Sequence, residues 1–205
     1  MSNVSSVLAL GAHPDDLELG CGATLAKLAS QGVAIRAVIL TDGGQGGSGD
    51  FDRASETLAS LAVLGVTDVA LHSFPDTRLH ERLNDAIAVI EQHVREIQPD
   101  RVYTMFDRDR HQDHRTVYEA SAVACRGVPQ ILGYETPSSY PNFIPTVFES
   151  VDEFIERKVE ALKVHRSQGS RLYMQEDKIR AAAHFRGVQV DRGHTEGFMP
   201  YKLVF

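Results

Sequence analysis

Short hydrophobic runs alternate along this chain with stretches in which apolar residues recur every three or four positions. Short apolar runs are typical of buried strands, and the three-to-four spacing is typical of amphipathic helices. The predicted strands are Val7–Leu10, Ile35–Leu40, Val69–Leu71, Val102–Met105 and Gln130–Tyr134. The predicted helices among them are Ala23–Gln31, Asp52–Leu64, Leu83–Ile97 and Arg115–Ala124.

This alternation predicts an α/β fold. Strand–helix–strand units cross over with a right hand, so they build a mostly parallel sheet with helices on both faces, a Rossmann-like arrangement. Ligands of such sheets bind beyond the carboxyl ends of the strands. The segments expected there are 11–20, 41–50, 72–80, 106–114 and 135–145.

The last quarter of the chain predicts two more helices and a final strand. The pattern indicates helices at Asp152–His165 and Gln175–Arg186 and a strand at Tyr201–Phe205. His165 falls on the apolar face of its helix, which favours a packed histidine over a catalytic one. Because the chain has no repeat and no linker-like segment, residues 1–205 are predicted to form a single domain.

Composition and charge narrow the class of protein. The chain has 205 residues, of which 42% are hydrophobic and 24% charged, and its net charge is −7. This excess of acidic residues argues against a nucleic-acid or anionic-membrane partner. Cys21 and Cys125 are too few for a disulfide framework or a cysteine-rich zinc site. With no signal peptide pattern and no long apolar stretch, we expect no membrane span and a cytoplasmic location.

Two polar motifs each follow a predicted strand directly. The first is Ala12-His-Pro-Asp-Asp16 and the second is His111-Gln-Asp-His114. Either motif alone is explained by a polar turn or a helix cap. Both together, at strand ends that open at the same edge of a parallel sheet, allow His13, Asp16 and His114 to converge.

Two imidazoles and one carboxylate are typical ligands of catalytic zinc, which keeps its fourth position for water. Zinc lowers the pKa of that water and polarises a bound carbonyl. Asp15 is then the candidate general base. His111 is a candidate donor to the oxyanion and the leaving group, and Asp113 is a candidate to orient an imidazole.

Both motifs, with their surroundings, resemble the LmbE/PIG-L family of zinc-dependent de-N-acetylases. The resemblance rests on AHPDD at 12–16, followed by LELGCGAT, and on HQDH at 111–114. Between them, Arg53-Ala-Ser-Glu56 followed by Leu64-Gly65 is similar to a helix of the family. The resemblance covers nearly the whole chain. It implies a Rossmann-like fold and an enzyme that removes acetyl groups from N-acetylglucosaminyl compounds.

The resemblance also implies a cofactor and ligands. Zn²⁺ would be held by His13, Asp16 and His114. A small-molecule N-acetyl amino-sugar would be the partner, and assembly into a homo-oligomer stays open because family members often assemble.

Four further residues take roles by resemblance. Asp15 would be the general base, and His111 would stabilise the transition state or protonate the amine, with Asp113 tuning it. Arg53 would contact substrate hydroxyls or phosphate. One position departs from the pattern of some members, because Asp109 stands where they have a tyrosine. A carbonyl polarised by that tyrosine is therefore not implied.

Two other functions stay open at this point. The glycine-rich segment 41–50 suits a non-catalytic Rossmann-like module that binds a nucleotide, although it lacks the Lys-Ser/Thr ending of a P-loop. Alternatively, the zinc site belongs to an amidase that acts on a thiol conjugate.

Overall fold

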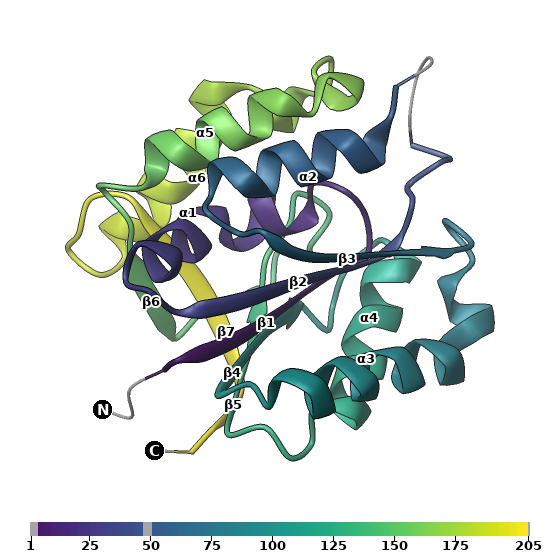
Figure 1. Ribbon diagram of the computed structural model, residues 1–205. Helices are drawn as coiled ribbons and strands as arrows, with labels where there is room; N and C mark the ends of the chain where they lie inside the picture. The colour runs from purple at the N-terminus through teal and green to yellow at the C-terminus, as the bar shows by residue number, and fades with distance from the viewer. Residues whose placement is uncertain (1–3, 47–50, 205) are drawn as a thin grey trace.

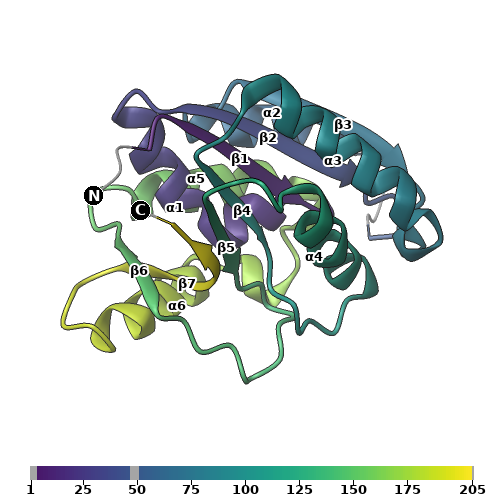
Figure 2. The ribbon, with the colours of Figure 1, turned by 90° about the horizontal axis from the view of Figure 1, so that it is seen from below.

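The computed structural model describes residues 4–46 and 51–204. Within these residues, seven strands form one sheet in the order β3-β2-β1-β4-β5-β7-β6 (Figures 1 and 2). Strands β1 to β5 run parallel, and β7 is antiparallel to both of its neighbours. The predicted α/β fold with a mostly parallel sheet is therefore confirmed. The strands are β1 Ser6–Gly11, β2 Ala34–Thr41, β3 Asp68–Phe74, β4 Arg101–Met105, β5 Gln130–Tyr134, β6 Val147–Ser150 and β7 Thr195–Leu203.

Helices cover both faces of the sheet, with α1, α2 and α5 on one face and α3 and α4 on the other (Figure 1). Across the described ranges, no helix combines the length and the apolar character that a membrane span needs. The α-helices are α1 Asp16–Ser30, α2 Arg53–Val63, α3 Leu83–Ile97, α4 Gln112–Ala124, α5 Ile155–Val164 and α6 Glu176–Val188. The 3₁₀ turns are η1 Leu79–Arg82, η2 Arg166–Gln168 and η3 Leu172–Met174.

The central strands are hydrophobic on both sides because helices cover both faces of the sheet. Val7, Leu8 and Leu10 of β1 are fully buried, as are Ile39 and Leu40 of β2. This core fixes the positions at which β1 and β4 end.

The strand order reverses between β1 and β4. From β1 the chain proceeds outward through β2 and β3, and it then returns on the other side of β1 as β4. Loops that leave neighbouring strands in opposite directions open a crevice at such a reversal. The segments 12–16 and 106–111 leave the sheet at this point, so both polar motifs face the same crevice.

The first helix begins earlier than the sequence predicts. Helix α1 starts at Asp16 rather than Ala23, and it is interrupted at Cys21, whose backbone is not helical (φ −141°, ψ 18°). After the interruption, the amides of Ala23 and Thr24 donate to the carboxylate of Glu196 at 3.2 and 2.7 Å. The apolar spacing predicted the second segment only, because the first carries the acidic residues that face the crevice.

The C-terminal part of the sheet also differs from the prediction. Strand β7 begins at Thr195, well before the predicted Tyr201, and Phe205 lies outside the described residues. The sequence pattern did not predict the first part of this strand, because Gly197 and Pro200 are both unfavourable in a strand interior. The short strand β6 was not predicted, and α5 begins at Ile155 rather than Asp152.

Candidate metal centre

The structure brings together the three residues predicted as metal ligands. His13 lies in the loop after β1, Asp16 is the first residue of α1, and His114 is in the first turn of α4. His13 Nδ1 lies 3.3 Å from His114 Nε2 and 3.5 Å from Asp16 Oδ2, and His114 Nε2 lies 3.2 Å from Asp16 Oδ1. All three side chains are buried, so the nitrogens and oxygens face one another away from bulk water.

These spacings fit a zinc ion. Zinc binds imidazole nitrogen and carboxylate oxygen at about 2.0–2.2 Å in a tetrahedral arrangement, in which neighbouring ligand atoms are separated by about 3.3–3.6 Å. His114 Nε2 lies 3.3 Å from His13 Nδ1 and 3.2 Å from Asp16 Oδ1, and both separations agree with such an arrangement. The donor set and its size therefore suit zinc, with one position left for a small oxygen ligand.

Carboxylates hold the outer nitrogen of each of these imidazoles. His13 Nε2 lies 3.1 Å from Asp113 Oδ2 and 3.1 Å from Asp76 Oδ1, and His114 Nδ1 lies 3.2 Å from Asp109 Oδ2. An outer N–H that donates to a carboxylate leaves the lone pair on the inner nitrogen. Both inner lone pairs then point toward the same small volume, as metal binding requires.

Sequence reasoning missed Asp76 and gave Asp109 no positive role. Asp76 follows β3 and accepts a 2.8 Å hydrogen bond from the amide of Gln45. Asp109 accepts from the amide of His111 at 2.8 Å and from the hydroxyl of Thr136 at 2.9 Å. Both lie in segments expected at the crevice, 72–80 and 106–114, but spacing along the chain does not indicate which imidazole a distant carboxylate contacts.

Asp113 acts on a different imidazole from the one that the family resemblance implied. Its carboxylate contacts His13 rather than His111, and it also accepts the amides of Thr77 at 2.7 Å and Leu79 at 3.1 Å. These contacts tie the start of α4 to the segment after β3 and hold His13 in place.

Asp16 is held as an ionised carboxylate. Its Oδ2 accepts the amides of Ala12 at 3.0 Å and His13 at 2.7 Å, which leaves Oδ1 facing His114. Burial alone would raise the pKa of Asp16, but His114 and His13 hold it well below its usual range. A buried carboxylate that stays charged is suited to bind a cation.

Asp15 is close to the ligands but lies in a different environment. Its backbone is left-handed (φ 95°), a strained conformation for a residue with a side chain and one that concentrates at functional sites. Its Oδ2 lies 3.7 Å from Arg53 Nη2. Burial, together with the charge of Asp16, raises the pKa of Asp15 to about 7. A carboxylate with this pKa suits a general base near neutral pH.

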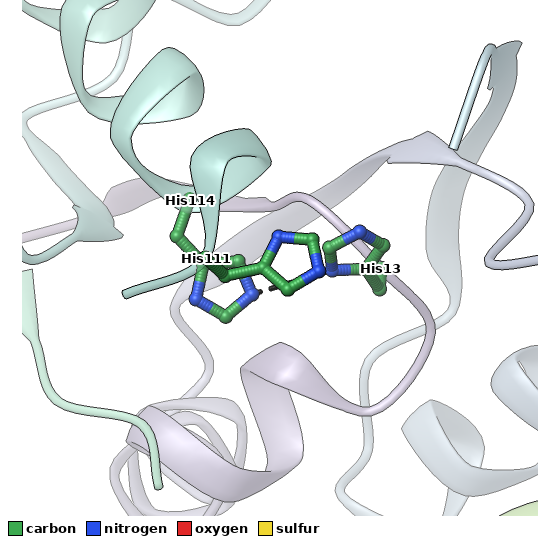
Figure 3. A group of neighbouring side chains, drawn as sticks. All are labelled: His13, His111 and His114. Atoms are coloured by element: carbon green, nitrogen blue, oxygen red, sulfur yellow. Dashed lines mark hydrogen bonds between the residues drawn. The ribbon is translucent and has the colours of Figure 1, made fainter. Parts of the chain in front are cut away.

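The ring of His111 packs against both candidate ligand imidazoles and borders the cavity. The ring centroids of His111 and His13 are 4.5 Å apart, and those of His111 and His114 are 4.8 Å apart (Figure 3). His111 Nδ1 accepts the amide of Asp113 at 3.2 Å, so the neutral ring carries its proton on Nε2. Burial, and then the charges of His13 and His114, lowers the pKa of His111. The ring is therefore a neutral hydrogen-bond donor.

Within the described ranges, two groups of side chains have donor atoms close enough together to hold a metal, and neither contains Asp16. One is His13 with His111 and His114, and the other is His13 with Asp76 and Asp113. The first shares two residues with the site described above. The second lies on the outer nitrogen of His13, where its carboxylates already accept that N–H.

A cavity of about 510 Å³ opens above these residues. Arg53, Arg110 and Arg171 line it, and each donates to a backbone carbonyl, with Arg53 Nη2 2.9 Å from Pro14 O. Arg53 is also the first residue of α2, and its Nη1 donates to the carbonyl of Gly43 in the glycine-rich segment. Part of that segment, 47–50, lies outside the described residues. Arginine and aspartate side chains both line the cavity, so it offers donors and acceptors to a hydroxylated substrate.

Two side chains near the site, His165 and Cys21, are buried in the protein interior. His165 is buried, as expected from its place on the apolar face, and its Nε2 lies 2.9 Å from Glu18 Oε1. Cys21 is fully buried at the interruption of α1, and burial raises the pKa of its thiol well above the usual value. A buried neutral thiol is a poor nucleophile, so Cys21 belongs to the core.

Known proteins resemble this chain in sequence. A family model described as PIG-L, GlcNAc-PI de-N-acetylase, matches residues 8–125, which contain both polar motifs. An uncharacterized deacetylase of Escherichia coli (strain K12), YaiS, is 52% identical over 167 residues, covering 78% of this chain and 90% of that protein. Diacetylchitobiose deacetylase of Thermococcus kodakarensis is 28% identical over 193 residues, covering 82% of this chain and 71% of that protein.

The fold is found in enzymes of more than one chemistry. The structure of a 4-carboxy-2-hydroxymuconate hydratase from Pseudomonas putida KT2440 matches 98% of this chain and 98% of its own with a TM-score of 0.87. The two sequences are only 19% identical, so the match shows a common fold alone. Function must be argued from the site.

Proposed function

This chain belongs to the PIG-L family of de-N-acetylases, and from that premise we propose that it is a zinc-dependent hydrolase. Its substrate is an N-acetylated amino sugar or an N-acetylglucosaminyl conjugate, from which it releases acetate and the free amine. The names of the Thermococcus relative and of the family model both refer to N-acetylated sugars, which supports this class of substrate.

One observation carries the proposal. His114 Nε2 lies 3.3 Å from His13 Nδ1 and 3.2 Å from the free oxygen of Asp16, Oδ1, and carboxylates hold the outer nitrogen of each imidazole. We assign these three residues as the ligands. When bound, zinc would supply Lewis acidity that polarises the amide carbonyl and lowers the pKa of water.

The remaining steps belong to side chains around the ligands. Asp15 takes a proton from the attacking water, since its carboxylate borders the same cavity and its pKa of about 7 suits that task. His111 Nε2 donates a hydrogen bond to the oxyanion of the tetrahedral intermediate. The proton that leaves with the amine comes from Asp15 or His111, the two titratable groups on either side of the ligands.

Positioning residues complete the assignment. Asp113 and Asp76 orient His13, and Asp109 orients His114. Arg53 is suited to bind hydroxyl or phosphate groups of the substrate, because its guanidinium borders the cavity beside Asp15.

A panel of substrates tests the proposal. Amine release is measured for N-acetylglucosamine, its methyl and aryl glycosides, diacetylchitobiose and an N-acetylated thiol conjugate, each with and without a chelator. Chelator-sensitive release of amine from at least one sugar supports the proposal. Release from the thiol conjugate alone would assign a different amidase activity, and nucleotide-dependent thermal stabilisation without any amine release would favour a binding module.

A further inference from the structure

A second cavity, of about 300 Å³, adjoins the cavity above the candidate metal ligands. It lies between α6, β7 and the segment 135–137 that follows β5. Leu19, Thr136, Pro137 and Tyr173 line both cavities, so the two are direct neighbours. The mechanism proposed above makes no use of this space.

The wall formed by α6 is apolar. Ile179, Ala182, Ala183 and Phe185 of this helix line the cavity, and Leu19 faces them from α1. Phe185 is 59% exposed, so its ring is accessible at the edge of the cavity. These side chains offer a surface for an apolar group rather than for hydroxyls.

The cationic side chains that line this cavity already have carboxylate partners. Lys158 Nζ lies 2.6 Å from Glu196 Oε1, with both side chains buried.

A second ion pair closes the opposite side of the cavity. Arg186 donates to both oxygens of Glu135 at 2.6 and 2.7 Å, and at the surface Lys178 pairs with Asp177 at 2.8 Å. Since paired charges attract an anion weakly, this cavity offers little to an anionic group.

We propose that the cavity along α6 binds the group attached to the sugar, and that this group is an uncharged apolar aglycone such as an aromatic ring or a short alkyl chain. The proposal rests on the proposed function, which places the N-acetyl sugar in the cavity above the candidate metal ligands. The volume is sufficient, because an apolar cavity of about 150 Å³ holds a benzene molecule.

Turnover of matched glycosides tests this subsite. The zinc-loaded enzyme is assayed with the methyl and 4-methylumbelliferyl glycosides of N-acetylglucosamine, in both anomeric forms. We expect kcat/KM to favour the 4-methylumbelliferyl glycoside by about tenfold or more, mainly through KM, since a tenfold ratio corresponds to only about 1.4 kcal/mol. In Ala182→Trp, the new ring fills the cavity, and the ratio of kcat/KM between the two glycosides falls toward one.

Two further variants make the result specific. Ala181 is exposed on the same helix and does not line the cavity, so Ala181→Trp is the matched control and keeps the preference. Phe185→Ala removes an exposed wall residue without disturbing the core, and it lowers the preference. Equal kcat/KM values for the two glycosides in wild type, or a preference that Ala182→Trp leaves intact, overturn the proposal.

Calorimetric titration separates this proposal from the proposed function. If no glycoside is deacetylated, the proposed function fails, but binding of 4-methylumbelliferyl N-acetylglucosaminide can still be measured. Binding to wild type that Ala182→Trp weakens about tenfold and Ala181→Trp retains supports the subsite without any turnover. Equal binding by the three proteins, or no binding to wild type, contradicts it.

Discussion

Nδ1 of His13 and Nε2 of His114 face each other at 3.3 Å across the point where the strand order reverses. The opposite nitrogen of each ring lies against a carboxylate, so each ring carries its proton on the outside. Two inward lone pairs this close repel each other unless a cation lies between them. A proton or a metal ion can fill that role, and the two compete.

The first prediction concerns this competition. Burial alone would lower the pKa of His114, but Asp16 and Asp109 raise it to about 9. Because this pKa exceeds the unfolded value of 6.5, protonation of His114 stabilises the folded, metal-free protein. This stabilisation is fully present below about pH 6.5 and is lost as the pH rises through about 9. Urea unfolding of the metal-free protein between pH 6 and 9.5 should show this loss, and protein with equimolar zinc should not. If the free energy of unfolding of the metal-free and the zinc-containing protein changed with pH in parallel, this prediction would be contradicted.

The second prediction concerns the ligands. His114→Ala removes one of three donors and leaves the site unable to retain zinc through dialysis, whereas wild type retains about one ion per chain. Elemental analysis by mass spectrometry measures this directly. His72→Ala is the matched control, since His72 pairs with His93 at 3.1 Å away from the cavity. Full zinc occupancy in His114→Ala would refute the ligand assignment.

The third prediction separates catalysis from metal binding. Asp15→Asn keeps the size of the side chain but removes the base, so kcat should fall by about 10²–10⁴-fold while zinc content stays unchanged. Steady-state kinetics and metal analysis on the same preparation check both parts. Wild-type turnover in this variant would exclude Asp15 as the base.

The fourth prediction concerns Asp109. Asp109→Asn replaces the acceptor for His114 Nδ1–H with an amide, and we expect the zinc affinity to fall by about 10–100-fold. Competition with a chromophoric chelator gives the affinity. Asp107→Asn, on the same loop but beside Tyr201, should bind zinc as wild type does. If the two variants bind zinc equally, Asp109 does not position the ligand.

The fifth prediction concerns the interruption of α1. Glu196→Ala leaves Lys158 buried and charged without its partner, and it also removes the acceptor for the amides of Ala23 and Thr24. We expect the free energy of unfolding to fall by about 3–5 kcal/mol.

Glu149 is the control for this change. It stands opposite Glu196 on the neighbouring strand β6, and its ion pair with Lys27 is partly exposed. Glu149→Ala should lower the free energy of unfolding by at most about 1 kcal/mol, as measured by chemical denaturation. Equal losses in Glu196→Ala and Glu149→Ala would show that the buried pair does not hold the interrupted helix.

Much of the fold could be predicted because the hydrophobic pattern records burial. The runs at Val7–Leu10 and Ile35–Leu40 lie inside β1 and β2, since parallel strands covered on both faces are continuously apolar. The hydrophobic pattern did not predict that α1 begins at Asp16, because the first turn of this helix is acidic where it faces the site. It failed again at β7, where Gly197 and Pro200 break the alternation.

The site could be predicted in part for a related reason. His13, Asp16 and His114 come from two compact motifs at strand ends, and parallel topology brings such ends together. Asp76 has no motif around it, and its contact with His13 depends on how the segment after β3 folds back. The partner of Asp113 was assigned to the wrong imidazole because both His111 and His13 are within reach, and only the three-dimensional structure decides between them.

The most direct test of the central claim is a chelation cycle on one substrate. Acetate and free amine are followed together by proton NMR with the sugar that the panel shows to be best, before chelation, after removal of metal, and after zinc is restored. We expect equimolar release of acetate and amine that stops on chelation and returns with about one zinc per chain. Undiminished release of acetate and amine from metal-free protein, or none from zinc-loaded protein with any N-acetylated sugar, would contradict this expectation.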